Sequence, residues 1–315
     1  MKIVITDAAT VCDESISLDD IKALGDTYIY PLSDNAELIE RISDADIVIC
    51  NKTNFTADVL RHAPRLKYIG LFATGYNNID LDYCNAHGIT VCNVPGYSTE
   101  AVAQHTIAFI LALVNRVGEY NETVKQGDWV KSQTFSYFPL PLLELNGKTL
   151  GIVGYGSIGR RVADIARAFG MRVLVHNRRA VNDNSVTQVD LDTLLRESDF
   201  VSMHCPLNED SRGMMNADAF AKMKKGAYFI NTARGPLIDE NALYDALVSG
   251  KLAGAGVDVL CTEPMTPECP LLNAPNCFIT PHIAWAGVET RRRLIKIVAK
   301  NIECFLNGNP QNTVK

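Results

Sequence analysis

Three ionisable side chains suited to proton transfer and carboxylate binding each follow a predicted strand in the second half of the chain. They are Arg234, Glu263 and His282. An imidazole exchanges protons near neutral pH, and an adjacent carboxylate fixes its tautomer and stabilises its protonated form. A guanidinium binds a carboxylate through two parallel hydrogen bonds. Arg234 alone could form a surface ion pair and Glu263 alone could be a solvated loop carboxylate, but together they predict an acid–base site at one sheet edge.

A glycine-rich segment fits the pattern Gly-x-Gly-x-x-Gly between a predicted strand at 150–153 and a helix that ends at 169–170. In this context the first glycine permits a tight turn, the second lets the backbone approach a pyrophosphate, and the third lets helix and strand pack closely. N–H groups at the helix N-terminus attract phosphate. We therefore predict that a dinucleotide is bound by Gly154, Gly156, Ser157, Ile158 and Gly159.

The residue expected to contact the adenosine ribose is Asn177, at the end of the next predicted strand. An Asp or Glu there would accept a hydrogen bond from the 2′-hydroxyl and repel a 2′-phosphate. Asn does not repel a phosphate, and the guanidinium groups of Arg178 and Arg179 would attract one. The sequence thus favours NADP(H) slightly over NAD(H). The alternative is that both arginines are solvated and the Asn binds the hydroxyl of NAD(H).

The choice of His282 as the acid–base group depends on where the six histidines fall. Ligands of a doubly wound sheet bind beyond the carboxyl ends of its strands, where His176, His204 and His282 are predicted. His176 ends the strand on the adenosine side, remote from a nicotinamide. His204, in the turn with Cys205 and Pro206, is expected to line the cofactor. His282 follows the last strand, where the nicotinamide would lie.

Two series of short apolar strands alternate with amphipathic helices, which is typical of βαβ units and parallel sheets. We predict an α/β protein with two doubly wound parallel-sheet domains. A long helix is expected from 99 through 117 and another from 288 to 306, while 118–146 shows aromatics and prolines without periodicity. The predicted strands are 2–6, 27–31, 46–50, 68–72, 90–93, 149–153, 172–176, 200–204, 227–231, 254–259 and 278–280.

Composition narrows the class of protein further. The 315 residues are enough for two domains, and 30 Lys+Arg against 36 Asp+Glu give a net charge of −6, which disfavours nucleic acid as a partner. No apolar run reaches the ~18 residues of a membrane span. The start of the chain resembles a strand and not a signal peptide. None of the nine cysteines lies in a C-x-x-C pair, so we expect reduced thiols, a cytoplasmic protein and no metal site.

Nearly the whole chain resembles the D-isomer-specific 2-hydroxyacid dehydrogenase family. The resemblance implies a Rossmann dinucleotide domain inserted into a flavodoxin-like substrate domain, with boundaries at 1–98 and 287–315 for the substrate domain and 99–286 for the dinucleotide domain. It also implies that 118–146 is an arm that builds a homodimer. The segments that carry the resemblance are 73–80, 94–96, 101–105, 154–159, 204–207, 231–235, 256–259, 263–264 and 281–285.

The resemblance assigns roles to individual residues. It implies that Arg234 binds the substrate carboxylate and carbonyl, that Glu263 is the partner of His282, and that His282 is the general acid/base. Backbone N–H groups at Thr74 and Gly75 would hold the substrate carboxylate. Further cofactor contacts are implied for His204, Cys205, Pro206, Thr232, Ala233, Arg234, Asp258 and His282, with Asp258 near the nicotinamide.

Within the family, the chain is similar to the glycerate dehydrogenase/hydroxypyruvate reductase branch. We therefore expect hydride transfer between NAD(P)(H) and a D-2-hydroxy acid or 2-oxo acid such as D-glycerate/hydroxypyruvate or glyoxylate. A D-lactate-type or other 2-oxo acid reductase is the alternative within the class, and a formate-type dehydrogenase suits the Glu263–His282 pair less well. A dinucleotide-sensing interaction protein is the alternative of a different class.

Overall fold

The computed structural model describes all residues from Met1 to Lys315, which form two compact units. Unit 1 comprises Met1–Ser98 and Trp285–Lys315, and unit 2 comprises Thr99–Ala284. Unit 2 is therefore a continuous stretch inserted between two segments of unit 1. Its end at Ala284 lies just before the boundary at 286 that the sequence suggested.

Unit 1 contains a six-stranded sheet in the order β13-β5-β4-β3-β1-β2, parallel except for β13. Without β13 this is the flavodoxin-like order. Its strands are β1 (Lys2–Ile5), β2 (Asp26–Ile29), β3 (Ile47–Cys50), β4 (Tyr68–Leu71), β5 (Thr90–Cys92) and β13 (Thr313–Val314). Its helices are η1 (Ala8–Thr10), α1 (Asp19–Lys22), α2 (Asn35–Ile42), α3 (Ala57–Leu60), α4 (Leu81–Ala86) and α11 (Val288–Leu306).

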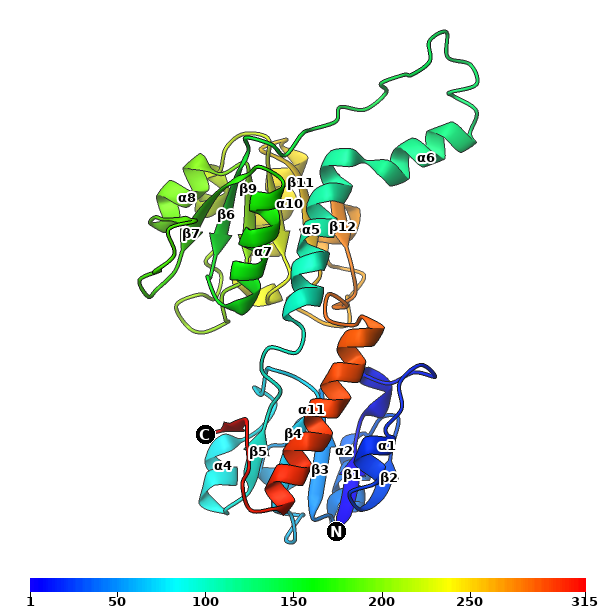
Figure 1. Cartoon of the computed structure of the whole chain (residues 1–315), viewed down its shortest axis with the longest axis vertical. Coiled ribbons are helices and arrows are strands. Elements are labelled where there is room, and N and C mark those ends of the chain that lie inside the picture. The colour runs from blue at the N-terminus through cyan, green and yellow to red at the C-terminus, as the bar shows by residue number, and fades with distance from the viewer. The chain divides into compact units, whose positions relative to one another are not determined.

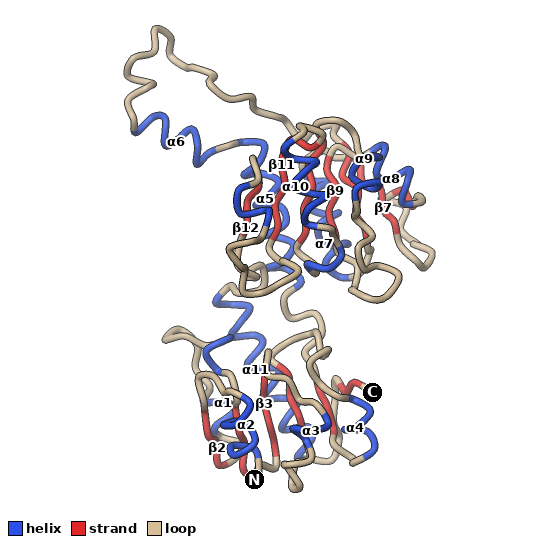
Figure 2. The backbone as a smooth tube through the Cα atoms, turned by 180° about the vertical axis from the view of Figure 1, so that it is seen from behind, coloured by secondary structure: helices blue, strands red, loops and turns tan.

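Alternation along the strands of unit 1 sends side chains to two cores. Ile3 and Ile5 of β1 pack with α1 and α11 on one face, whereas Val4 packs with α2 and α3 on the other (Figures 1 and 2). Because both faces are covered, every residue of β3 and β4 is buried, and the strands read as continuous apolar runs.

Unit 2 contains an all-parallel, seven-stranded sheet in the order β12-β11-β10-β9-β6-β7-β8. The chain order reverses at β6, which is the Rossmann arrangement and places ligands beyond the carboxyl ends of the strands. Its strands are β6 (Thr149–Val153), β7 (Arg172–His176), β8 (Thr187–Gln188), β9 (Phe200–Met203), β10 (Ala227–Asn231), β11 (Leu252–Val257) and β12 (Cys277–Ile279).

Helices cover both faces of the unit 2 sheet. The helices α5 and α7 pack on one face, and α8, α9 and α10 pack on the other. The helices of this unit are α5 (Thr99–Asn115), α6 (Val117–Lys125), α7 (Ser157–Ala168), α8 (Leu191–Glu197), α9 (Ala217–Lys222), η2 (Gly235–Leu237), α10 (Glu240–Val248) and η3 (Pro270–Asn273).

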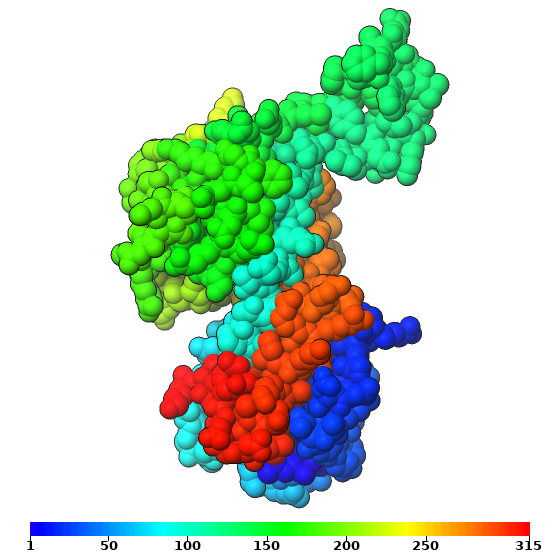
Figure 3. Space-filling view, viewed as in Figure 1, coloured from blue at the N-terminus to red at the C-terminus, as the bar shows by residue number.

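The segment after α5 differs from the prediction of an irregular stretch over 118–146. The helix predicted through 117 stops at Arg116, which has a left-handed φ of 50°, and α6 follows at once. The chain from α6 onward projects from the rest of unit 2 (Figures 1 and 3) before it returns at Leu143, which packs against the core of that unit. No single helix is long and apolar enough to cross a membrane; only the pair α5 and α6, bent by 48°, meets that test when joined.

Candidate active site

His282 and Glu263 form a hydrogen-bonded pair beyond the carboxyl ends of β12 and β11. His282 Nδ1 lies 2.7 Å from Glu263 Oε2. The other carboxylate oxygen, Oε1, accepts the backbone N–H of Leu260 at 3.0 Å. Glu263 is thereby tied to the end of its own strand. A carboxylate held in this way orients the imidazole and fixes which ring nitrogen carries a proton toward it.

The turn that carries His282 is held by a buried carboxylate. Asp258 is 1% exposed, and its oxygens accept the N–H groups of Ile283 at 2.8 Å and Ala284 at 2.9 Å. Its Oδ1 also accepts the Thr280 hydroxyl at 2.5 Å. His282 itself has a left-handed φ of 56°, and its N–H donates to the backbone carbonyl of Asp258. These bonds compensate for the strain of a non-glycine residue at positive φ.

His105, on α5, extends this network. Its Nε2 lies 3.0 Å from Thr280 Oγ1 and 3.8 Å from Asp258 Oδ1. Sequence reasoning singled out Asp258 as a cofactor contact but missed the roles of Thr280 and His105. Asp258 comes directly after β11, and Thr280 comes directly after β12. This parallel placement was the sequence signal that could have identified Thr280 as a partner of Asp258.

Arg234 follows β10, the strand adjacent to β11, so the predicted catalytic residues follow three neighbouring strands. The Arg234 side chain is exposed, and its Nη1 donates to the Ala233 carbonyl at 2.7 Å. Buried Asn231 closes the turn by donating to the Arg234 carbonyl and accepting from the Ala233 N–H. A Cβ at Gly235 would lie 2.0 Å from the carbonyl carbon of Leu260, so this turn packs against the strand end that holds Glu263.

The glycine-rich loop connects β6 to α7 and fits the phosphates of a dinucleotide. Gly154 has a φ of 98°, and a Cβ there would lie 2.4 Å from the Cys205 nitrogen; one at Gly159 would lie 2.2 Å from the Gly154 oxygen. A Cβ at Gly156 would meet nothing within 4 Å. No side chain caps α7, so its first N–H groups, at Ser157 and Ile158, face this open space.

Asn177 is engaged in holding the glycine-rich loop. Its Oδ1 accepts the Tyr155 N–H at 3.1 Å, and its Nδ2 donates to the Arg179 carbonyl at 2.9 Å. The side chains of Arg178 and Arg179 are exposed and make no ion pair. Two cations therefore flank the end of β7, where the adenosine ribose of a dinucleotide would lie.

The residues after β9 and β10 that were predicted to contact the cofactor lie near the glycine-rich loop or inside unit 2. His204 Nε2 bonds to Ser202 Oγ at 2.8 Å, and burial lowers the pKa of His204 to about 3, so it is neutral at physiological pH. Burial raises the pKa of the Cys205 thiol to about 11. Pro206 is exposed. Thr232 is buried, and its hydroxyl contacts that of Thr106 at 3.0 Å.

The remaining predicted residues, Thr74 and Gly75, belong to unit 1, where they follow β4. The Thr74 hydroxyl donates to the Val94 carbonyl at 2.8 Å, and Asn93 Nδ2 donates to the Thr74 carbonyl at 2.7 Å. The backbone N–H groups of Thr74 and Gly75 donate to no other group of the chain. The loop is therefore fixed through its carbonyl and hydroxyl, with its donors available to an anion.

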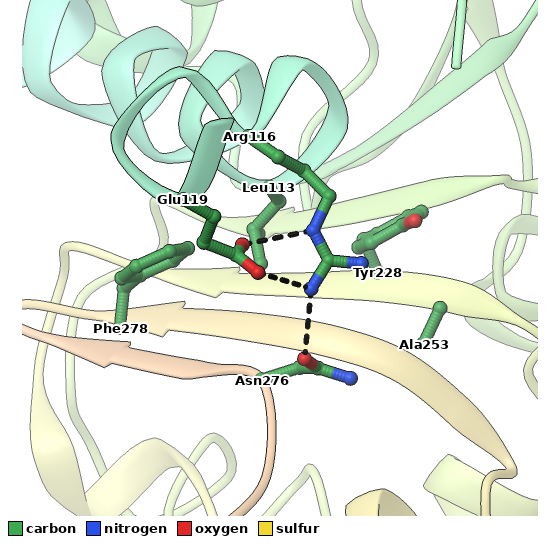
Figure 4. Close-up of a pocket in the computed structure, with 7 residues that line it drawn as sticks. All are labelled: Leu113, Arg116, Glu119, Tyr228, Ala253, Asn276 and Phe278. Atoms are coloured by element: carbon green, nitrogen blue, oxygen red, sulfur yellow. Dashed lines mark hydrogen bonds and ion pairs between the residues drawn. The ribbon is translucent and has the colours of Figure 1, made fainter. Parts of the chain in front are cut away.

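A separate small pocket lies at the amino ends of β10, β11 and β12 (Figure 4). Arg116 dominates it, donating Nε and Nη2 to the Glu119 carboxylate at 2.8 Å each and approaching Asn276 Oδ1 at 3.4 Å. The guanidinium is thus already neutralised. No group of three or more His, Cys, Asp or Glu side chains is arranged to hold a metal ion.

The chain is similar to known dehydrogenases and reductases over most of its length. The profile of "D-isomer specific 2-hydroxyacid dehydrogenase, NAD binding domain" matches residues 107–284. A hydroxypyruvate reductase from Blautia hydrogenotrophica is 43% identical, covering 100% of this chain and 99% of the relative. A glycerate dehydrogenase from Methylorubrum extorquens is 41% identical over 89% of this chain and 88% of the relative.

Two solved structures superpose on nearly the whole chain. An acyclic imino acid reductase (Bsp5) in complex with NADPH and D-Arg superposes with a TM-score of 0.89 at 34% identity, covering 100% of both chains. A D-lactate dehydrogenase from Aquifex aeolicus, complexed with NAD and lactic acid, gives 0.85 at 34% identity over 98% of this chain and 96% of that one. The chain therefore belongs to the D-isomer-specific 2-hydroxyacid dehydrogenases, enzymes that transfer hydride between a nicotinamide and a small 2-hydroxy or 2-oxo acid.

Proposed function

We propose that this enzyme reduces hydroxypyruvate or glyoxylate, with His282 as the general acid and Arg234 as the substrate clamp. The observation that carries the proposal is the 2.7 Å contact between His282 Nδ1 and Glu263 Oε2 beyond adjacent parallel strands. The names of the two curated relatives, a hydroxypyruvate reductase and a glycerate dehydrogenase, support hydroxypyruvate, and glyoxylate is the smaller 2-oxo acid of the same class.

In the proposed mechanism, the bound nicotinamide supplies or accepts the hydride. Since Glu263 occupies Nδ1, His282 exchanges its proton with the substrate oxygen at Nε2. The protonated imidazole donates this proton as the carbonyl is reduced, and the neutral imidazole accepts it as the alcohol is oxidised. Low pH therefore favours reduction and high pH favours oxidation.

Two sets of donors bind the substrate in this proposal. The Arg234 guanidinium binds the carboxylate and stabilises negative charge that develops on the carbonyl oxygen. The N–H groups of Thr74 and Gly75 in unit 1 bind a substrate carboxylate in this proposal, which is supported by their lack of any partner within the chain. Anion binding by successive backbone N–H groups needs no cationic side chain.

The coenzyme is proposed to be NADP(H) in preference to NAD(H). The support is the absence of an acidic side chain at Asn177, the bonding of that Asn to the loop, and the unpaired cations Arg178 and Arg179. A 2′-phosphate would pair with both guanidinium groups. The solved relatives include one with NADPH and one with NAD, so both coenzymes occur in close structural relatives.

We also propose that the enzyme is a cytoplasmic homodimer joined through the arm that follows α5. Val130, Phe135 and Phe138 of this arm are 88%, 91% and 81% exposed. Apolar side chains this exposed on one segment indicate a protein interface. Reduced thiols are typical of the cytoplasm, and all nine cysteines are free.

Steady-state turnover tests the proposed function. The purified protein is mixed with NADPH or NADH and with hydroxypyruvate, glyoxylate or pyruvate, and absorbance of the reduced nicotinamide is followed. We expect the highest kcat/KM with NADPH and hydroxypyruvate or glyoxylate. A preference for pyruvate would favour the D-lactate-type alternative, and a clear NADH preference would overturn the coenzyme assignment. No oxidation with any 2-oxo acid would favour the dinucleotide-sensing interaction protein.

A further inference from the structure

Asp7 is a buried carboxylate at the carboxyl end of β1 that the proposed mechanism does not use. It is 3% exposed. Its oxygens accept the backbone N–H groups of Asn51 at 2.9 Å, Lys52 at 2.6 Å and Thr53 at 2.9 Å, and the Thr53 hydroxyl at 3.0 Å. A buried carboxylate is tolerated only when donors of this kind solvate it. All of these donors belong to the turn 51–53 after β3, so Asp7 fixes the shape of that turn.

The turn 51–53 also holds the loop that carries Thr74 and Gly75. Asn78 Nδ2 donates to the Thr53 carbonyl at 2.7 Å and approaches the Asn51 carbonyl at 3.4 Å. The Asn78 carbonyl accepts the Phe55 N–H at 2.8 Å. The strands β3 and β4 are parallel neighbours, which brings the two loops to one sheet edge.

The other end of the same loop is anchored to the residues that follow β5. Val94 donates its N–H to the Ala73 carbonyl at 2.9 Å, and Asn93 binds the Thr74 carbonyl. Thr74 and Gly75 therefore lie between an anchor on the Asn93 side and an anchor at Asn78. Only the second anchor depends on a charged group, Asp7.

We propose that Asp7 is a positioning residue for the substrate carboxylate: through the turn 51–53 and Asn78 it sets the direction of the N–H groups of Thr74 and Gly75. The inference rests on the proposed function of that loop. Asp7 touches neither substrate nor coenzyme. Its loss affects substrate binding and leaves the dinucleotide loop of unit 2 unchanged.

Replacing Asp7 by Asn tests this role at nearly constant size. An amide has one acceptor oxygen, and its NH₂ group would face donors of the turn, so at least one N–H of 51–53 loses its partner. We expect the KM for the 2-oxo acid to rise about tenfold, the effect of one lost buried hydrogen bond. The dissociation constant of the coenzyme, measured by nicotinamide fluorescence, stays unchanged.

Asp46→Asn is the matched control in the same unit. Asp46 is also buried, accepts the Lys2 N–H at 2.9 Å and pairs with Arg65 at 3.0 Å, but it precedes β3 at the opposite sheet edge. We expect this variant to lose thermal stability with an unchanged KM. Equal rises in KM for D7N and D46N would overturn the positioning role.

Amide hydrogen exchange at Ile79 and Phe55, whose N–H groups bond to carbonyls of the loop 73–79, supplies a readout that does not need turnover. Faster exchange of these two N–H groups in D7N than in D46N supports the proposal, and equal protection overturns it. This separates the two proposals: a wild-type protein that turns over no 2-oxo acid overturns the proposed function, whereas unchanged loop protection in D7N overturns the role of Asp7 alone.

Two further variants keep the inference testable should D7N not fold. Thr53→Val removes one of the bonds to Asp7 and should raise the KM about threefold, within the range of one partly exposed hydrogen bond. Asn78→Ala breaks the link itself, and its effect should not multiply with that of T53V, since both act along one path. If the effects of T53V and N78A on KM multiply, the two substitutions act independently, and the proposed path from Asp7 through Thr53 and Asn78 is wrong.

Discussion

Glu263 occupies one ring nitrogen of His282, so the chemistry of the pair has to take place at the other. His282→Ala removes the proton donor, and we expect kcat to fall about 10²–10⁴-fold, the usual contribution of a positioned acid–base group. Glu263→Gln should lower kcat less, since the imidazole keeps a hydrogen-bond partner and loses only the negative charge beside it. Steady-state kinetics across pH 5 to 9 measure both, with exposed His62→Ala as the control. Near-normal turnover by H282A would remove His282 from the mechanism.

His204 makes folding stability depend on pH. Burial lowers its pKa in the folded state to about 3, whereas a histidine in the unfolded chain titrates near its ordinary value of 6.5. Between these values the unfolded state binds more protons, so stability falls as the pH drops through this window, by at most about 1.4 kcal/mol per pH unit from this group. His204→Gln keeps a partner for Ser202 without titrating. Urea unfolding from pH 7 to 4 should show a shallower loss for H204Q, and equal slopes would contradict the assignment.

The glycine-rich loop joins β6 to α7 through glycines with different surroundings. A Cβ at Gly156 meets open space, whereas one at Gly159 lies 2.2 Å from the Gly154 oxygen. Gly156→Ala should therefore keep its melting temperature and raise the coenzyme KM at least tenfold, because the methyl group occupies the space for the pyrophosphate. Gly159→Ala should lose about 1–3 kcal/mol of stability as well. Calorimetry and coenzyme titration separate the two, with Gly118→Ala, also facing open space, as the control. A stable G159A would show that the packing of helix on strand can relax.

The long buried strands were predictable because their residues are apolar on both faces. The sequence predicted β3, β6, β7 and β10 almost to the residue, since a parallel sheet covered on both sides confines polar residues to the ends of these strands. It missed the two-residue strands β8 and β13, which are too short to show a period of two. The break between α5 and α6 was missed because an Arg in the left-handed region gives no compositional signal.

At the site, the sequence predicted which catalytic side chains pair, but not which residues hold the surrounding loops in place. The pair of Glu263 with His282 was expected from its placement after adjacent strands, and the structure contains it. Asn177 was predicted to face the ribose, and the bonds of its side-chain amide to the backbone of Tyr155 and Arg179 were not foreseen. The roles of Asp7 and Thr280 were not foreseen, because Asp7 acts through backbone N–H groups and Thr280 through its hydroxyl, and only the folded loops determine where these groups point.

For the whole molecule, the exposed arm makes assembly testable. The double substitution of Phe135 and Phe138 by Ser should convert a dimer, of twice the 34.6 kDa chain mass, into a monomer, because it removes the two most exposed aromatic side chains of the arm. Light scattering after size exclusion measures this. Leu272→Ser, which removes a half-exposed apolar side chain outside the arm, is the control and should remain dimeric. A wild-type protein that elutes as a monomer at micromolar concentration would overturn the homodimer.

The insertion of unit 2 within unit 1 fixes an order of events during synthesis on the ribosome. Unit 2 is complete once Ala284 has emerged, whereas unit 1 still lacks α11, which fills one of its two cores, and β13, which covers the edge of β5. Until those last residues appear, one apolar sheet face of the first hundred residues is covered only in part, by η1 and α1, and a chaperone could bind the remainder. The unit whose first residues are translated earliest is therefore the unit that finishes folding last.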